Sequence, residues 1–188
     1  NDNNYSNSEE EDEENSSTRC AYCGISKIER LVKCNECHRW FCNGRLDSNS
    51  ASHILFHLTK SKHKEIFLPK ESLVGEMVME CYNCNCRNIF LLGFLENKDG
   101  EAGFVICREP CLTIGKIEDN EFDKSKWVPL IQDKKILDWV VPEPENEVEK
   151  HLCQRVNIRN MSKLEEKWEK EKILENQKQA NRNRNKRL

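Results

Sequence analysis

The cysteines and histidines of this 188-residue chain are spaced like metal ligands. Residues 20–42 read CAYCGISKIERLVKCNECHRWFC and hold five cysteines, four of them in two C-x-x-C pairs. Such a pair places two thiolates on one tight turn, and structural zinc sites combine two close pairs of ligands in a tetrahedron. The pattern therefore predicts structural zinc.

Twelve side chains qualify as ligands, which is enough for three closed sites of four. A closed site leaves no open position for water, so a catalytic zinc is not expected. Eleven cysteines cannot all pair with one another, and their spacing favours metal over disulfides. The candidates, in chain order, are Cys20, Cys23, Cys34, Cys37, Cys42, His53, His57, His63, Cys81, Cys84, Cys107 and Cys111.

The last four candidates lie at the two ends of a predicted β-hairpin. Cys81 and Cys84 precede the apolar run RNIFLLGFLE, whereas GFVICREPC contains Cys107 and Cys111. Both runs are expected to be strands, joined by the turn-forming segment ENKDGEA. The hairpin would bring all four thiols to one ion, in an arrangement that resembles a zinc ribbon.

The pairing of the first eight candidates stays open on the residues alone. His53 and His57 are four positions apart in SNSASHILFHLTKSKH, which predicts a short serine-capped helix with both histidines on one face. They could share one ion or serve two. Alternate use of the pairs would give a cross-brace, with Cys20, Cys23, Cys42 and His53 on one zinc and Cys34, Cys37, His57 and His63 on another.

Composition and charge exclude several function classes. The net charge is −3, and residues 19–141 hold 18 Lys and Arg against 17 Asp and Glu. Nine zinc-bound thiolates on three divalent ions would make this segment slightly negative. Dedicated nucleic-acid binders are normally basic, so direct RNA binding is the weakest function hypothesis. The sequence contains neither a G-x-x-x-x-G-K-[ST] phosphate loop nor a G-x-S-x-G nucleophile elbow.

The sequence gives no sign of a secreted or membrane protein. No signal peptide is visible in residues 1–18, and no apolar run approaches the roughly 18 residues of a membrane span. We therefore expect a reducing, cytoplasmic location, where dense cysteines usually bind metal.

Changes in composition divide the chain into segments. Residues 112–142 form a connector in which Trp127 and Trp139 should pack on the core, and Val148, Leu152 and Val156 form the first apolar stripe of the helical region. The predicted segments are a disordered acidic tail (1–18), a cysteine–histidine-rich domain (19–142, comprising a two-zinc module at 19–70, a zinc hairpin at 76–111 and the connector), an amphipathic helical region (143–178) and a disordered basic tail (179–188).

Residues 19 to about 170 resemble the cysteine–histidine-rich domain of the up-frameshift RNA helicases of nonsense-mediated mRNA decay. The resemblance rests on CAYCG, RWFCNGR, SHILFHL, GEMVMECYNCNCRNIFLLGF, CREPC and WVPLIQDKKILDWVV. It implies a small zinc-stabilised α+β fold with three zinc ions, tandem RING- or U-box-like modules, short hairpins and a C-terminal helix. It also implies the cross-braced pairing, with His53 and His57 on different ions. His63 departs from the family, which often has cysteine there.

The resemblance further implies a regulatory function. The domain would bind the second up-frameshift protein and restrain the helicase core of its own polypeptide, with RNA bound through that parent protein. The helicase core is absent from this chain, so the segment itself is not expected to be an enzyme. A RING/U-box-like ubiquitin ligase domain is the alternative.

Three apolar residues of the hairpin could form a partner surface, and four cysteines and histidines fall outside the quartets. Ile89, Phe90 and Leu92 are proposed as an outer apolar face for the partner, with core packing almost equally favoured. Cys86, Cys153, His38 and His151 have no ligand role in this scheme; an inert thiol is expected for Cys86 and a surface position for His38.

Overall fold

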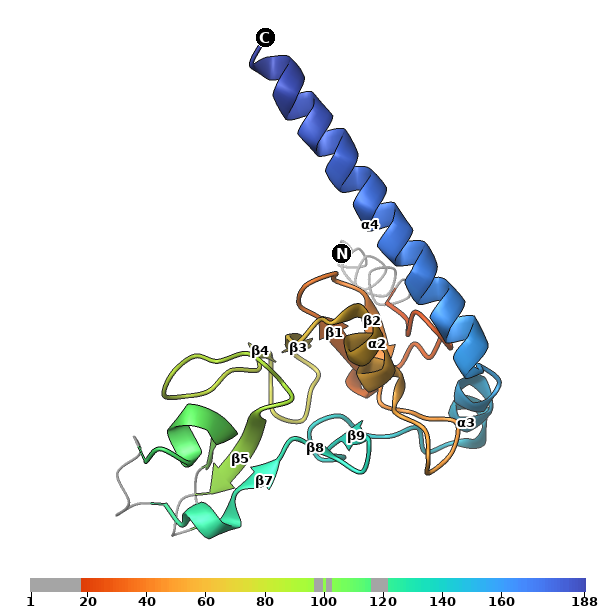
Figure 1. Cartoon of the computed structure of the whole chain (residues 1–188). Helices are drawn as coiled ribbons and strands as arrows, with labels where there is room; N and C mark the ends of the chain where they lie inside the picture. The colour runs from red at the N-terminus through yellow and green to blue at the C-terminus, as the bar shows by residue number, and fades with distance from the viewer. Residues whose placement is uncertain (1–17, 97–99, 101–102, 116–121) are drawn as a thin grey trace, which may run out of the picture.

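The computed structural model describes residues 18–96, 100, 103–115 and 122–188. Short antiparallel strands, one short α-helix and three shorter helical turns form the described body, and two further α-helices follow at the C-terminal end (Figure 1). The predicted α+β class with a C-terminal helix is therefore confirmed. The acidic segment 1–17 and most of the turn predicted at ENKDGEA lie outside the described residues.

Three small sheets account for the strands, in the orders β2-β1-β3-β4, β6-β5-β7 and β8-β9, and every pairing is antiparallel. The elements in chain order are η1 (Ile28–Arg30), β1 (Leu31–Cys34), β2 (Trp40–Cys42), α2 (His53–Ser61), β3 (Ile66–Leu68), β4 (Met77–Val78), β5 (Leu92–Glu96), β6 (Gly103–Cys107), η2 (Arg108–Leu112), η3 (Lys124–Lys126), β7 (Val128–Pro129), β8 (Ile131–Gln132), β9 (Lys135–Ile136), α3 (Glu147–Gln154) and α4 (Ile158–Lys186).

Helix α2 packs against the first sheet and begins where the serine-rich segment predicts. Ser52 is the N-cap, and its hydroxyl oxygen accepts a hydrogen bond from the backbone N–H of Leu55. The helix buries Ile54 and Leu58 together with both histidines, and it ends at Lys62, which adopts a left-handed conformation. The helix therefore presents His53 and His57 to the interior of the first module.

The hairpin of β5 and β6 forms the second module, as the two apolar runs predict. The pairing runs from Leu92 opposite Cys107 to Glu96 opposite Gly103, and β7 adds a third strand on the other side of β5. Trp127 lies across β5 at Gly93, where a Cβ atom would be 2.1 Å from the indole ring, and its Nε1 donates to the carbonyl of Ile106. Trp127 thus packs as predicted, whereas Trp139, expected to pack on the core as well, is 44% exposed and contacts Phe94 of that module in a T-shaped arrangement.

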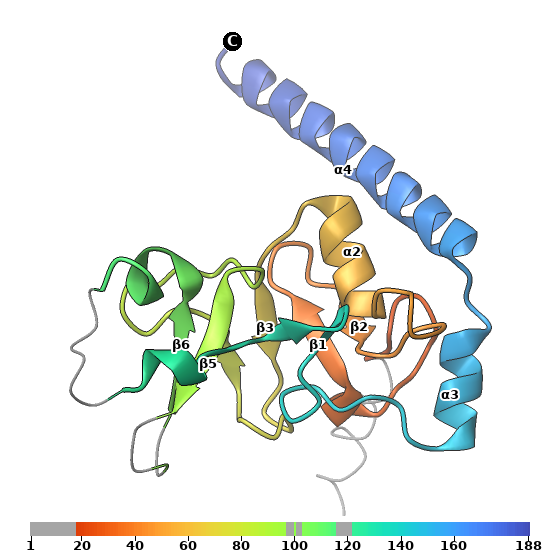
Figure 2. The same cartoon turned by 60° about the horizontal axis from the view of Figure 1, so that its bottom comes forward.

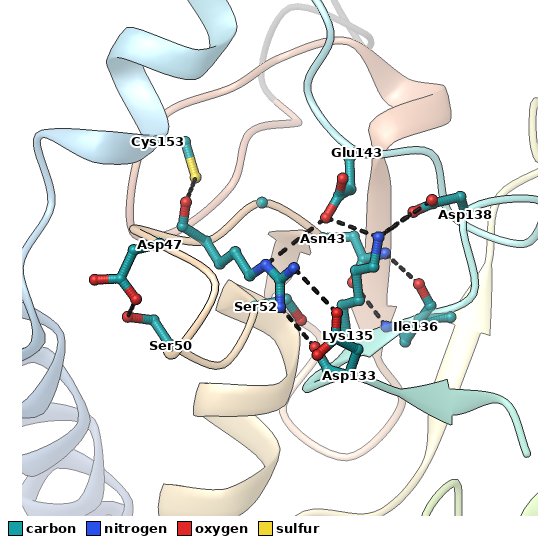
Figure 3. Close-up of polar contacts among 12 residues, drawn as sticks. Asn43, Asp47, Ser50, Ser52, Asp133, Lys135, Ile136, Asp138, Glu143 and Cys153 are labelled. Atoms are coloured by element: carbon teal, nitrogen blue, oxygen red, sulfur yellow. Dashed lines mark hydrogen bonds and ion pairs between the residues drawn. The ribbon is translucent and has the colours of Figure 1, made fainter.

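The connector ties the two modules together through Asn43, which directly follows the candidate ligand Cys42. The Asn43 side chain is fully buried and donates to the carbonyls of Ile136 (2.6 Å) and Val141 (2.9 Å). Its Oδ1 accepts from the Ile136 N–H at 2.9 Å (Figure 3). Since β7 pairs with β5, the connector is fixed to the second module at one end and to the first at the other.

Ion pairs lie near the buried Asn43 side chain, closer to solvent. Lys135 contacts Asp138 (3.0 Å) and Glu143 (3.1 Å), while Arg45 donates to the carbonyl of Asp133 (Figure 3). Exposed pairs of this kind contribute little individually, so the buried Asn43 bonds are the stronger link.

The C-terminal helices differ from the predicted pattern in two respects. Val148, expected on the inner stripe of α3, is 71% exposed, and Glu149 and Cys153 are buried instead. The buried face of α3 is therefore shifted by one residue from the predicted stripe. Glu149 lies on this face because its carboxylate pairs with the buried guanidinium of Arg30 at 3.2 Å. Helix α4 continues to Lys186, so the prediction of a disordered tail at 179–188 is wrong; elongating a helix needs no new nucleus, and arginine and lysine favour it.

The second half of α4 leads away from the body of the molecule (Figures 1 and 2). Residues from Glu169 onward are exposed, including Ile173 and Leu174. Within the described ranges, no helix combines the length and apolar character needed to cross a membrane.

Replacing Asn43 by alanine should loosen the connector from the first module. The change leaves two carbonyls and one N–H buried without partners, and each unpaired group costs roughly 1–3 kcal/mol. We expect a loss of at least about 3 kcal/mol in the free energy of unfolding, the low end of three such penalties, measured by urea denaturation in zinc-saturated buffer. Asn49→Ala, at an exposed position, is the control. Equal unfolding midpoints for the two variants would contradict this assignment.

Candidate metal centres

Three tight turns hold the C-x-x-C pairs, and all three are built in the same way. The residue after the second cysteine adopts a left-handed conformation and donates its N–H to the carbonyl of the first cysteine at 2.9 Å. These residues are Gly24, His38 and Asn85, which donate to Cys20, Cys34 and Cys81 respectively. Gly and Asn adopt this conformation at low cost, and His does so more often than most residues. This fixes the two sulfurs of each pair on one side of the turn.

The first candidate site is fully buried and lies between the first turn, β2 and α2. The Nδ1 atom of His53 is 3.3 Å from the Sγ of Cys42 and 3.7 Å from that of Cys20. The sulfurs of Cys23 and Cys42 are 3.7 Å apart. The quartet brought together is Cys20, Cys23, Cys42 and His53, with all ligand atoms within 4.8 Å of one another.

The second candidate site lies at the other end of β1 and is partly open to solvent. The Nε2 atom of His57 is 3.3 Å from the Sγ of Cys37, and the Nδ1 atom of His63 is 3.4 Å from that of Cys34. The quartet is Cys34, Cys37, His57 and His63. The structure thus places His53 and His57 in different groups, so the chain alternates between the two sites in the cross-braced order.

The third candidate site joins the two ends of the β5–β6 hairpin. The sulfurs of Cys84 and Cys107 are 3.6 Å apart, and the Nδ2 of Asn83 donates to Cys111 at 3.2 Å. Cys84 is exposed while its three partners are buried, which places this site at the surface. The quartet is Cys81, Cys84, Cys107 and Cys111, the set that the hairpin pattern groups.

The three quartets fit zinc in spacing and in charge. Tetrahedral zinc with Zn–S near 2.3 Å and Zn–N near 2.0–2.1 Å separates sulfur from nitrogen by about 3.5 Å and sulfur from sulfur by about 3.8 Å, and the contacts above lie within a few tenths of an ångström of these values. A disulfide would need about 2.05 Å between sulfurs. Burial raises the pKa of the Cys42 thiol well above its ordinary value, and it also raises the pKa of Cys107. Thiols packed this closely ionise together only beside a compensating cation, and a divalent metal supplies that charge.

Two residues that the sequence leaves without a role lie directly behind the histidine ligands. The Nε2 of His53, on the side away from its site, is 3.8 Å from the Sγ of the buried Cys153 in α3, and this thiol also points to the carbonyl of Arg45 (Figure 3). The Nδ1 of His57 is 2.6 Å from a carboxylate oxygen of Glu165 in α4. No spacing rule could find either contact, because each joins residues about a hundred positions apart.

Glu165 has a second partner, the hydroxyl of Tyr22, which donates to the same carboxylate oxygen. Burial, followed by the hydrogen bond and the negative charge of Glu165, raises the pKa of Tyr22 far above its ordinary value, so this hydroxyl is a donor. Tyr22 lies between Cys20 and Cys23 in the first site. One buried carboxylate therefore contacts a histidine of the second quartet and a residue of the turn that carries two cysteines of the first.

The remaining unassigned residues lie outside the three quartets. His38 is exposed as predicted, and His151 is exposed as well. Cys86 is half-buried, and its carbonyl accepts a hydrogen bond from Cys81.

The apolar face proposed for a partner is not present as predicted. Ile89 and Leu92 belong to the core, with 0% and 1% exposure, whereas Phe90 is 39% exposed. Both side chains pack in the buried core; the Ile89 N–H also bonds to the carbonyl of Lys64 in the first module, and Leu92 begins the central strand of its sheet. Phe90 alone of the three remains on the surface.

Comparison with known sequences agrees with this geometry. The profile of a UPF1 zinc-binding family, described as "RNA helicase (UPF2 interacting domain)", matches residues 18–171. The chain belongs to this family. It is 44% identical over 151 residues to the regulator of nonsense transcripts 1 homolog of Arabidopsis thaliana, an alignment that covers 79% of this chain and 12% of that protein.

Two yeast relatives extend the comparison. The ATP-dependent helicase NAM7 of Saccharomyces cerevisiae is 40% identical over 157 residues, covering 84% of this chain and 16% of that protein. The ATP-dependent helicase upf1 of Schizosaccharomyces pombe is 38% identical over 156 residues, covering 83% and 17%. The chain thus spans less than a fifth of the length of these three relatives. The family is a zinc-binding one, and three quartets of the described residues could each hold a metal ion, which is consistent with zinc.

Removing one imidazole from the second site should lower the number of bound zinc ions. Native mass spectrometry of the purified chain should show three ions, and His63→Ala should show two, or a third that is weakly held, because three protein ligands hold zinc less well than four. His38→Ala, an exposed histidine next to Cys37, is the control and should keep all three. Two ions in the unmodified chain, unchanged by His63→Ala, would contradict the assignment.

Proposed function

We propose that this chain is a zinc-stabilised protein-interaction domain that binds a UPF2-type protein and thereby controls an RNA helicase in the same polypeptide. The helicase would bind RNA and act in the cytoplasm, in nonsense-mediated mRNA decay. The observation that carries the proposal is the match of residues 18–171 to a UPF2-interacting domain. The names of the relatives, which are helicases and regulators of nonsense transcripts, support the second half.

The coordination chemistry supports a scaffold rather than a reaction centre. Each quartet supplies four protein ligands and leaves no position for water or substrate on the metal. Zinc bound in this way stabilises a fold whose apolar core is small, and a rigid surface binds a partner with less loss of conformational entropy.

The second module offers an exposed aromatic anchor for such a partner. Phe90 follows the buried Ile89, and its N–H is held by the side chain of Asn88 at 3.1 Å. Tyr82, in the turn of the third site, is 67% exposed and contacts Phe104 with ring centres 4.6 Å apart. Rigid aromatic side chains of this kind contribute a large share of binding energy at protein interfaces. We therefore place the partner site on this module, with Phe90 as its test residue.

Phe90→Glu should weaken binding of the UPF2-type partner while preserving the fold. A central aromatic anchor contributes at least about 2 kcal/mol, which corresponds to roughly a 30-fold weaker Kd, and calorimetry with the purified partner measures it. Val148→Glu, an exposed apolar residue on α3 at the opposite end of the molecule, is the control (Figure 2).

The same variant also tests control of the helicase. In the whole parent protein, Phe90→Glu should abolish stimulation of unwinding by the partner and leave basal ATP hydrolysis unchanged. Wild-type partner affinity with a native zinc content would remove Phe90 from the interface. Unchanged affinity for Phe90→Glu and Tyr82→Glu together would contradict the placement on this module.

A ubiquitin ligase domain is the second candidate, because the cross-braced order of the first two quartets is also that of RING domains. An autoubiquitination assay with purified E1, E2 and the zinc-loaded chain separates the two. Ubiquitin transfer that is lost in His63→Ala would favour the ligase, and its absence across several E2 enzymes would favour the interaction domain.

A further inference from the structure

Glu165 is a buried carboxylate whose polar contacts, within the described residues, join α4 to the first module. Its side chain is 9% exposed, although glutamate is almost never buried without a partner. The two partners are the Nδ1 of His57 at 2.6 Å and the hydroxyl of Tyr22. The neighbouring Glu166, by contrast, is exposed.

The orientation of the His57 ring indicates what the contact with Glu165 does. Nε2 points into the second quartet, 3.3 Å from Cys37, and Nδ1 points to Glu165. A neutral imidazole that binds metal through Nε2 carries its proton on Nδ1, where it can donate to a carboxylate. That hydrogen bond fixes the ring and raises its basicity, and removal of such a partner typically costs 10- to 100-fold in metal affinity.

Glu165 also lies at the centre of the contact between α4 and the first module. Met161 on the same helix is buried, and the indole of Trp168 stacks on Tyr22 with ring centres 5.8 Å apart. Trp168 also contacts Arg39, whose guanidinium lies 4.4 Å from the centre of the indole ring. Beyond Trp168 the helix is exposed. The docked part of α4 is thus residues 161–168, and the carboxylate is its only buried charge.

We propose that Glu165 is the positioning residue of the second zinc site, and that through it zinc binding and the docking of α4 stabilise each other. Zinc holds the His57 ring in the orientation that receives the carboxylate, and the docked helix holds the carboxylate against the ring. Because linkage is reciprocal, a tenfold loss of zinc affinity on undocking requires a tenfold loss of docking on zinc removal.

The test begins with zinc affinity in the full chain. Glu165→Ala should lower the affinity of one of the three ions by about 10- to 100-fold, measured by native mass spectrometry during competition with a chelator. Glu166→Ala removes the same charge one position away and should match the unmodified chain. In a His63→Ala background, where the second site is already weakened, Glu165→Ala should have no further effect on the other two ions.

The effect of zinc binding on the docking of α4 is measured by hydrogen exchange in that helix. Hydrogen exchange of amides 161–168 should be at least about tenfold faster in His63→Ala than in the unmodified chain, while amides 175–186 serve as the internal control. Glu165→Gln keeps the shape and one acceptor, so its zinc loss should be smaller than that of the alanine variant but greater than that of Glu166→Gln.

Two results would overturn the proposal. One is equal zinc retention by the Glu165 and Glu166 variants, and the other is unchanged protection of residues 161–168 in His63→Ala. If Glu165→Ala does not fold, the two glutamine variants decide the question alone. None of these measurements requires the partner protein, so a failure here is distinct from a failure of the proposed function.

Discussion

The gathering of nine thiols and three imidazoles into three groups of four is the constraint on which this structure depends. Thiolates whose sulfurs lie 3.6–3.7 Å apart repel one another and cannot all stay ionised in a buried site without a cation. Zinc bound in these quartets would balance the charge of the thiolates and add bond energy. A structural site contributes roughly 10–16 kcal/mol to folding, which equals the whole stability of an ordinary domain, about 5–15 kcal/mol.

The turns, helix α2 and the connector position the ligand side chains of these sites. The turns at Gly24, His38 and Asn85 orient the cysteine pairs, and helix α2 carries one histidine to each of two sites. Asn43 then attaches the connector directly beside the ligand Cys42. A chain whose strands are only two to five residues long can keep a single register because the ligands fix it at both ends.

The parts of the site that local spacing encodes could be predicted from the sequence. The C-x-x-C pairs and the two histidines one helical turn apart are local patterns, and the structure gathers the same twelve residues. The division of His53 and His57 between two sites is not local, and only the family resemblance supplied it. Glu165 could not be found, because a glutamate beside Leu164 and Trp168 looks like any charged residue next to an apolar stripe.

The burial of side chains in the second module likewise could not be predicted from local sequence. An apolar run such as IFLLGF predicts a strand but not which neighbours will cover it. Ile89 and Leu92 both belong to the buried core, so two of the three residues expected at a partner surface are covered by other parts of the fold. The helical end of the chain was likewise underestimated, because composition alone does not report that α4 is already nucleated upstream.

X-ray absorption at the zinc edge of the purified chain tests the central claim most directly. The three quartets contain nine sulfur and three nitrogen ligands, so each zinc should have on average three sulfurs at about 2.3 Å and one nitrogen at about 2.0–2.1 Å. That result would show that the closed Cys and His sites exist as described. Oxygen in the first shell, or four sulfurs per zinc, would contradict the account, because either would mean that the histidines do not hold the metal.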